Sequence, residues 1–161
     1  MNKFKGKRFS RNIVERYHKL TNYERICRYT RLDYNEVKIY SLSQPESWLD
    51  YPFGKRTLVF KIKMKMFGLL FTSKDLPRIN LKCDPEEAQI LREVFPSILP
   101  GYHMNKTHWN TILLDDSIPS GEVRRMIDNS YTLVVGSLSK VDKTRLAMVH
   151  GIRTVEPMSF N

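Results

Sequence analysis

Apolar and polar residues alternate in the middle of the chain in the way that predicts a β-strand with one buried face. Residues 57–63 place Leu58, Phe60 and Ile62 on one side and polar side chains on most of the other. A turn at Lys63 to Lys65 should follow, and residues 66–72 should return as the second strand of a hairpin. Gly68 inside this second strand indicates a bulge or a close approach of another chain segment.

A third strand is expected over residues 78–83, after a break at Asp75-Leu76-Pro77. Here Ile79, Leu81 and Cys83 should point inward. The polar residues between them should point outward: Arg78, Asn80 and Lys82. A later strand is predicted from Trp109 to Leu114, whereas residues 48–54, with their aromatic, proline and glycine content, are expected to be a loop.

Three helices are expected, one before these strands, one between them and one after them. Asp33 and Glu36 have the spacing of a capping box for a helix over residues 34–42. Asp84 followed by Pro85 should start a helix that ends near Phe95. The longest helix is predicted from Pro119 onward, because apolar residues recur there with a helical period. They are Val123, Ile127, Tyr131, Val134 and Leu138.

These elements predict an α+β fold: a two-layer sandwich with an antiparallel sheet and helices on one face. Residues 33–140 form the expected domain. Residues 1–32 should add a basic helical arm, with a helix from Ser10 to about Leu20 and a second piece over residues 23–29. Residues 141–161 are expected to be a tail with a short helix over residues 144–150.

The chain has 161 residues and a net charge of +10, and most of this charge lies near the N-terminus. Residues 1–31 carry ten basic and two acidic side chains, so their formal charge is +8. No apolar run is long enough to span a membrane, and no secretory signal is visible. With Cys27 and Cys83 far apart, free thiols in a reducing cytoplasm are the simplest expectation.

Several motifs occur in an order that resembles the MmcQ/YjbR family. They are Pro52-Phe53-Gly54, Lys65-Met66-Phe67, Leu81 to Glu86, Pro100 to Thr111 and Ser130-Tyr131. The resemblance covers residues 33–140 and implies a frataxin-like sandwich. It also implies the DNA-binding, double-wing role with which the family is often described, but no catalytic or ligand residues.

The first functional hypothesis is therefore a cytoplasmic DNA-binding protein of low sequence specificity. A basic arm attracts phosphate, and lysines on an open sheet face, with a hairpin tip as a wing, can lie along a nucleic-acid backbone. The residues expected to bind are Arg8, Arg11, Arg16, Lys61, Lys63, Lys65, Arg78, Lys82 and Lys106. The alternative is that the sheet lysines are an ordinary solvated face.

A second hypothesis places a small-molecule or catalytic site in the polar stretch between Pro100 and Thr111. Its candidate residues are Tyr102, His103, Asn105, His108 and Trp109. The alternatives are that Trp109 belongs to the core, or stacks on a base, and that His103 is bonded within the loop. No nucleophile with a base and no ligand set for a metal is visible, so neither catalysis nor a cofactor is expected. Pairing of the N-terminal helices of two copies, giving a homodimer, remains a third possibility.

Overall fold

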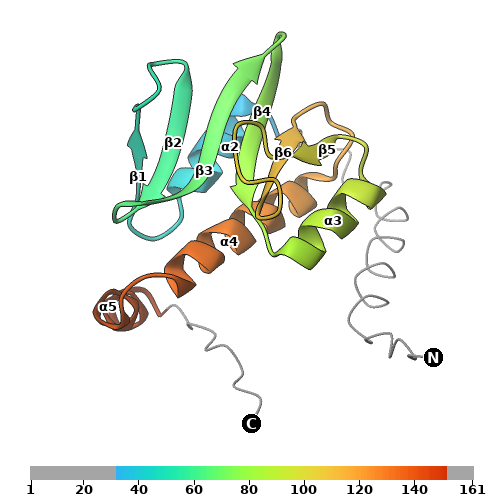
Figure 1. The fold of residues 1–161 in the computed structure, drawn as a ribbon. Coiled ribbons are helices and arrows are strands. Elements are labelled where there is room, and N and C mark those ends of the chain that lie inside the picture. Colours follow the sequence, from blue (N-terminus) through green and yellow to red (C-terminus); the bar gives the residue numbers. More distant parts are fainter. Residues whose placement is uncertain (1–31, 152–161) are drawn as a thin grey trace, which may run out of the picture. The chain divides into compact units, whose positions relative to one another are not determined.

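The computed structural model describes residues 32–151 (Figure 1). The helices within this range are α2 (Tyr34–Leu42), α3 (Pro85–Val94), α4 (Ser120–Gly136) and α5 (Lys140–His150). The strands are β1 (Ser47–Asp50), β2 (Thr57–Ile62), β3 (Lys65–Ser73), β4 (Leu76–Lys82), β5 (Ile98–Pro100) and β6 (Trp109–Leu113). The expected α+β class is confirmed.

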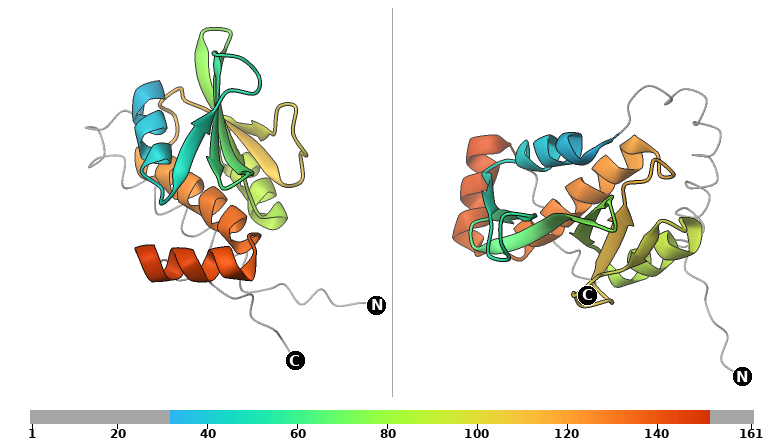
Figure 2. Two further views of the ribbon diagram at one scale, coloured as in Figure 1. Left: turned by 90° about the vertical axis from the view of Figure 1, so that its left-hand side faces the viewer. Right: turned by 90° about the horizontal axis from the view of Figure 1, so that it is seen from above.

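One antiparallel sheet contains all six strands, in the order β1-β2-β3-β4-β6-β5. Helices α2 and α4 lie on one side of it, and the loop between β5 and β6 lies on the other (Figure 2). We call these the helix face and the loop face. In this antiparallel meander, the β1–β2 and β3–β4 connections lie at one end of the sheet. The β2–β3 turn lies at the other end.

Local sequence signals start two of the helices as predicted. Asp33 accepts hydrogen bonds from the backbone of Asn35 and Glu36, and the Glu36 carboxylate accepts one from the Asp33 N–H at 2.9 Å. Asp84 accepts a hydrogen bond from the Glu86 N–H at 2.9 Å, with Pro85 in the first turn of α3. Each cap satisfies backbone donors that have no partner inside the helix.

The stripe on α4 packs onto the helix face. Ile127 is fully buried and Tyr131 is 4 % exposed. The Tyr131 ring meets Phe67 of β3 edge to face, with ring centroids 5.5 Å apart, a favourable aromatic geometry. Burial raises the pKa of the Tyr131 phenol to about 12, with the Glu46 carboxylate adding to the effect, so this hydroxyl is a donor, and it bonds the Pro45 carbonyl at 2.8 Å.

Ser130 of α4 bonds two backbone groups, one on β3 and one on β4, that have no partner in the sheet. The register between β2 and β3 shifts after Phe60, so the Phe67 carbonyl loses its regular position in the ladder. The buried Ser130 hydroxyl donates to this carbonyl at 2.5 Å and accepts from the Lys82 N–H of β4 at 2.8 Å. Gly68 provides the close approach expected there, because a Cβ at this position would lie 3.2 Å from the Phe60 ring.

Two sequence expectations about the strands are wrong. Residues 48–54 are not all loop, since β1 pairs with β2 in antiparallel register from Ser47 to Asp50. The break before the third strand is only a two-residue turn, Lys74 and Asp75, both with positive φ, and β4 already begins at Leu76. A two-residue turn with positive φ at both positions matches the twist of the strands that it joins, so the hairpin continues without a loop.

The chain remains structured beyond the end of the predicted domain. Helix α5 begins at Lys140, four residues before the short helix that was expected, and Leu146 is fully buried. The helices predicted over residues 10–20 and 23–29 lie outside the described residues. Within residues 32–151, no helix is both long enough and apolar enough to cross a membrane.

Candidate nucleic-acid interface

Lys61 lies on the loop face, as alternation predicts, but it has an acidic partner. Its Nζ is 2.5 Å from Asp50 Oδ2 on β1 and 5.4 Å from the centre of the Trp48 ring. The hydrogen bond from Lys61 lowers the pKa of the Asp50 carboxyl below its ordinary value, with a further contribution from the Tyr51 N–H. Lys61 therefore neutralises a carboxylate of the sheet edge.

Lys63 and Lys65 lie at the β2–β3 turn and are also engaged within the protein. Lys63 Nζ is 3.6 Å from Glu46 and 3.6 Å from Asp142 of α5. Lys65 Nζ donates to the Ser137 carbonyl, just beyond the C-terminus of α4, at 2.5 Å. A cation at this position satisfies a terminal carbonyl and complements the helix dipole. The hairpin tip that was expected to act as a wing is thus tied to α4 and α5.

Glu46 extends these contacts into a small ionic network. It pairs with Arg145 and Lys63, and His150 Nε2 lies 3.4 Å from its carboxylate. The network joins the segment before β1 to α5. We call this part of the molecule, with Lys63, Lys65, Glu46, Asp142 and Arg145, the closed end of the sheet.

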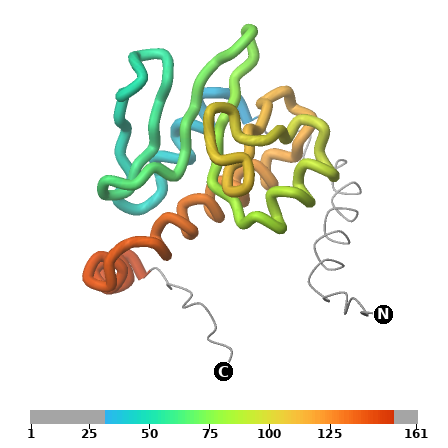
Figure 3. Tube along the Cα trace, in the orientation of Figure 1, coloured from blue at the N-terminus to red at the C-terminus, as the bar shows by residue number. Residues whose placement is uncertain are grey.

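The opposite end carries the β1–β2 loop and the β3–β4 turn, both at the top of Figures 1 and 3. Their proximity follows from the register, because Thr57 at the start of β2 pairs with Phe71 near the end of β3. Three exposed basic side chains lie on these connections: Lys55, Arg56 and Lys74. None of the three makes an ion pair with another residue between 32 and 151.

Arg78 adds a fourth positive charge beside these connections. It lies on the loop face of β4, in register with Phe71 on one side and Leu113 on the other. Its Nε is buried and has no hydrogen-bond partner within the described part of the chain. A buried guanidinium donor without an acceptor is costly, and an anion at this point would satisfy it.

Exposed aromatic rings accompany these charges. Tyr51 and Phe53 of the β1–β2 loop are 47 % and 68 % exposed, and Tyr102 of the β5–β6 loop is 53 % exposed. The Tyr102 ring stacks on Phe71 with an interplanar angle of 25° and centroids 5.9 Å apart. We call the set of Tyr51, Phe53, Lys55, Arg56, Lys74, Arg78 and Tyr102 the open end of the sheet.

Asn80 lies on the loop face, as alternation predicts, but it is not exposed there, because the β5–β6 loop covers it. Asn80 and Thr111 are each only 1 % exposed, beneath the β5–β6 loop. Asn80 Nδ2 donates to the Tyr102 carbonyl at 2.9 Å, and its Oδ1 accepts from Thr111 Oγ1 at 2.7 Å. Thr111 Oγ1 in turn accepts from the Tyr102 N–H at 2.8 Å. Two buried polar side chains therefore fix the backbone of one loop residue.

The rest of the polar stretch is held by its own backbone. Asn105 Oδ1 accepts from the Thr107 N–H at 2.9 Å, and the His108 carbonyl accepts from the Cys83 N–H at 2.8 Å. Trp109 is 9 % exposed, which places it in the core. The side chains of His103, Asn105 and His108 lie on the surface. The structure does not gather them around either of the two cavities considered next.

One cavity is an open groove of about 530 Å³ between α3 and the β5–β6 loop. Its lining includes Lys106, whose carbonyl accepts a hydrogen bond from Arg92 Nη1 at 2.9 Å. Lys106 is exposed there, and Lys82, on the loop face opposite Trp109, is partly exposed. These two lysines thus lie away from the open end, near the corner of α3.

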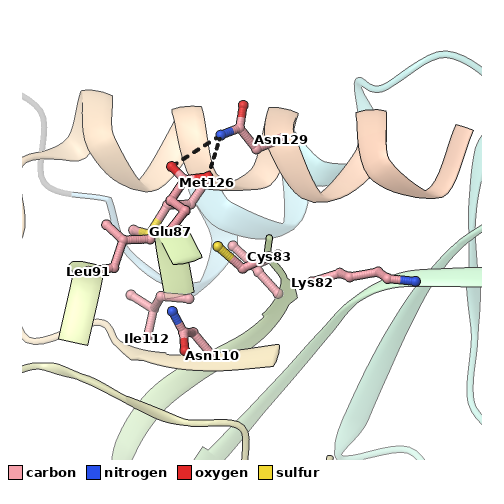
Figure 4. A pocket seen from close by; sticks show the side chains of 9 residues that line it. Lys82, Cys83, Glu87, Leu91, Asn110, Ile112, Met126 and Asn129 are labelled. Atoms are coloured by element: carbon pink, nitrogen blue, oxygen red, sulfur yellow. Dashed lines mark hydrogen bonds between the residues drawn. The ribbon is translucent and has the colours of Figure 1, made fainter. Parts of the chain in front are cut away.

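The other cavity lies between α3, β4, β6 and α4 and is shown in Figure 4. Its space of about 10 Å³ is about that of one water molecule. Cys83 lines it, and burial, followed by the Glu87 carboxylate, raises the pKa of this thiol to about 12. A thiol with so high a pKa is a poor nucleophile at neutral pH. Among the described residues no group of three or more histidine, cysteine or carboxylate side chains is arranged to hold a metal.

The sequence matches a known family model over residues 42–133, and the model is that of YjbR. Among relatives by sequence, the YbdF protein of Escherichia coli O157:H7 is 40 % identical over 110 residues, covering 68 % of this chain and 90 % of YbdF. The YyaQ protein of Bacillus subtilis is 34 % identical over 104 residues, covering 58 % of this chain and 86 % of YyaQ. Both relatives carry the description "uncharacterized", so they transfer no activity.

Solved structures agree with the sequence comparison. The crystal structure of Deinococcus radiodurans protein DR2400 superposes with a TM-score of 0.67 at 32 % identity, covering 79 % of this chain and 94 % of DR2400. A Pseudomonas syringae protein superposes with a TM-score of 0.56 at 30 % identity, covering 63 % of this chain and 97 % of that protein. These similarities extend over most of the described residues.

Proposed function

Since the chain belongs to the YjbR family, whose matched relatives bring no established activity with them, we propose from the residues themselves that it binds nucleic acid. The proposed partner is DNA, bound with low sequence specificity and without catalysis. The observation that carries the proposal is the open end of the sheet, where basic side chains that have no acidic partner between residues 32 and 151 lie beside exposed aromatic rings.

Phosphate groups are the natural ligands of such basic side chains. Lys55, Arg56 and Lys74 are exposed on two neighbouring connections, and Arg78 offers a guanidinium donor that no described residue satisfies. Two connections that project side by side from a sheet can follow a nucleic-acid backbone as a pair of wings. Contacts of this kind position a protein on the backbone and read no base sequence, which is the reason for proposing low specificity.

The N-terminal arm supplies the larger part of the attraction in this proposal. Residues 1–31 carry a formal charge of +8. Binding by so many cations releases counterions from the nucleic acid, so affinity should fall steeply as salt rises. Arg8, Arg11 and Arg16 remain the proposed contacts within the arm, with Lys82 and Lys106 as secondary contacts of the domain.

A salt series with the full chain tests the proposal. Binding to labelled duplex and single-stranded DNA would be measured for the wild type, for an open-end variant (Lys55→Glu, Lys74→Glu) and for an arm variant (Arg8→Glu, Arg11→Glu, Arg16→Glu). The matched control for the open-end variant is Lys38→Glu with Lys140→Glu, the same charge change on α2 and α5.

We expect both test variants to bind more weakly, with a shallower salt dependence, and the control to change less. Each lost phosphate contact should reduce the slope of log K against log salt by about 0.7 to 0.9. Absence of binding by the wild type at low salt would overturn the proposal. An equal loss in the control would show that net charge, and not the open end, determines affinity.

A further inference from the structure

The Tyr102 ring combines a large exposed area with an unusually fixed position. Tyr102 is 53 % exposed, while Thr111 accepts a hydrogen bond from its N–H and Asn80 donates one to its carbonyl. Asn80 and Thr111 are each 1 % exposed. Buried hydrogen-bond networks of this kind fix a single geometry. Asn80 and Thr111, two buried polar side chains, thus fix the backbone of Tyr102, whose ring lies at the surface.

The neighbours of Tyr102 in the chain restrict it further. His103 has a φ of 55°, in the left-handed region that non-glycine residues seldom adopt, and its ring centroid lies 4.0 Å from that of Tyr102. At Gly101 a Cβ would lie 2.7 Å from the Cβ of Trp109. Local backbone strain is often retained where it positions a functional group, and here both constraints act on the orientation of Tyr102.

The ring is also placed beside a site for an anion. One side of Tyr102 stacks on Phe71 of β3, and Phe71 is the register partner of Arg78 on β4. Arg78 Nε is a buried donor that lacks an acceptor among the described residues. The Phe71–Tyr102 stack and a guanidinium with an unsatisfied Nε donor therefore lie on the same face of the sheet, where Phe71 and Arg78 are on adjacent strands.

We propose that Tyr102 stacks on an unpaired nucleobase while Arg78 receives a neighbouring phosphate, so that the chain prefers single-stranded to duplex nucleic acid. The inference rests on the proposed nucleic-acid binding and names its substrate class. Bases within a duplex have both faces covered by their neighbours, whereas an unpaired base can add its face to the Phe71–Tyr102 stack. Because every base has such a face, stacking adds affinity without sequence preference.

Binding of the full chain to a single strand and to a blunt duplex that contains the same strand tests this inference. Tyr102→Ala should weaken binding to the single strand about tenfold or more, the range of one base–aromatic stack, and leave duplex binding nearly unchanged. Tyr102→Phe keeps the ring and should bind within about twofold of the wild type. Ile39→Ala, which removes an exposed apolar side chain of α2 outside the open end, is the control and should leave both affinities unchanged.

A fluorescent base gives a readout that separates stacking from a structural effect. A single strand with 2-aminopurine should lose fluorescence on binding to the wild type and to Tyr102→Phe, since a stacked 2-aminopurine is quenched. The Tyr102→Ala variant, added at saturating concentration, should quench it much less. Thermal melting of each variant checks that the domain remains folded.

The possible outcomes distinguish this inference from the proposal on which it rests. If the wild type binds neither strand, nucleic-acid binding itself is wrong. If it binds both, and Tyr102→Ala leaves single-strand affinity and quenching unchanged while Lys55→Glu with Lys74→Glu weakens binding, the open end is a phosphate site and the stacking role of Tyr102 is wrong. Equal weakening of single-strand and duplex binding by Tyr102→Ala would also contradict the preference for unpaired bases.

Discussion

The two ends of the sheet carry similar numbers of basic residues but use them differently. At the closed end Lys63 lies between Glu46 and Asp142, and Lys65 bonds a carbonyl beyond α4. At the open end Lys55 and Lys74 are exposed and have no acidic partner between residues 32 and 151. The same residue type stabilises the domain at one end and is available to a ligand at the other.

This difference indicates that location along the sheet, and not the number of charges, decides which lysines have partners within the described domain. A lysine in an ion pair or in a contact with a helix end stabilises the fold, and its ammonium group is then not free to bind phosphate. A basic residue on an antiparallel connection without such a partner keeps its full charge for an external anion.

The largest expected effect on stability is at the junction of α4 with β3 and β4. Ser130→Ala should lower the free energy of unfolding by about 3 kcal/mol, because it leaves the buried Phe67 carbonyl and Lys82 N–H without partners. Urea unfolding measures this loss. Ser137→Ala, which removes an exposed hydroxyl from the end of the same helix, is the control and should cost much less.

A smaller loss is expected on the loop face. Gly101→Ala should reduce the free energy of unfolding by about 2 kcal/mol, since the added Cβ would meet the Trp109 backbone and side chain. The comparison is with Gly121→Ala on α4, where nothing lies within 4 Å of the new Cβ. Similar stability of the two variants would show that the loop moves easily and does not hold Tyr102 rigidly.

The closed end offers a test of the helix-end contact. Lys65→Met keeps a long side chain but removes the donor to the Ser137 carbonyl, and it should lower the free energy of unfolding by about 0.5–1 kcal/mol. Nucleic-acid affinity should change little. A clear loss of affinity with no loss of stability would reverse the roles assigned to the two ends.

The smallest expected effect depends on pH. The hydrogen bond from Lys61 gives Asp50 a lower pKa in the folded protein than in the unfolded chain. Its stabilising contribution is therefore present above the unfolded pKa of about 3.9 and is lost as the pH falls through the folded pKa. Asp50→Asn should lower the urea midpoint slightly at pH 7, and the difference from wild type should vanish in acid. A difference that persists in acid would assign the effect to packing.

Local signals in the sequence were sufficient for much of the fold. Asp33 and Asp84 begin helices because their carboxylates act on the next few residues, and the stripe on α4 has an unambiguous helical period. The four-residue strand β1 was missed because it is half-exposed, has no clear alternation, and depends on pairing with β2, which lies farther along the chain.

Missing β1 also obscured the candidate site. If β1 is not recognised, Gly54-Lys55-Arg56 cannot be identified as the connection between two antiparallel strands. The sequence then predicts a wing only at the turn near Lys65. Alternation correctly placed Asn80 on the face opposite the helices, but it carries no information about which loop covers that face. Strand order and loop cover arise from contacts between distant residues, which a single sequence does not display.

The most direct test of the account compares the same charge change at the two ends. The variants Lys55→Met with Lys74→Met and Lys63→Met with Lys65→Met would be titrated with single-stranded DNA across a salt series. We predict that the open-end variant loses affinity and that its salt slope falls by about 1.4, two phosphate contacts, while the closed-end variant loses stability and keeps its affinity. Loss of affinity confined to the closed-end variant would contradict the account.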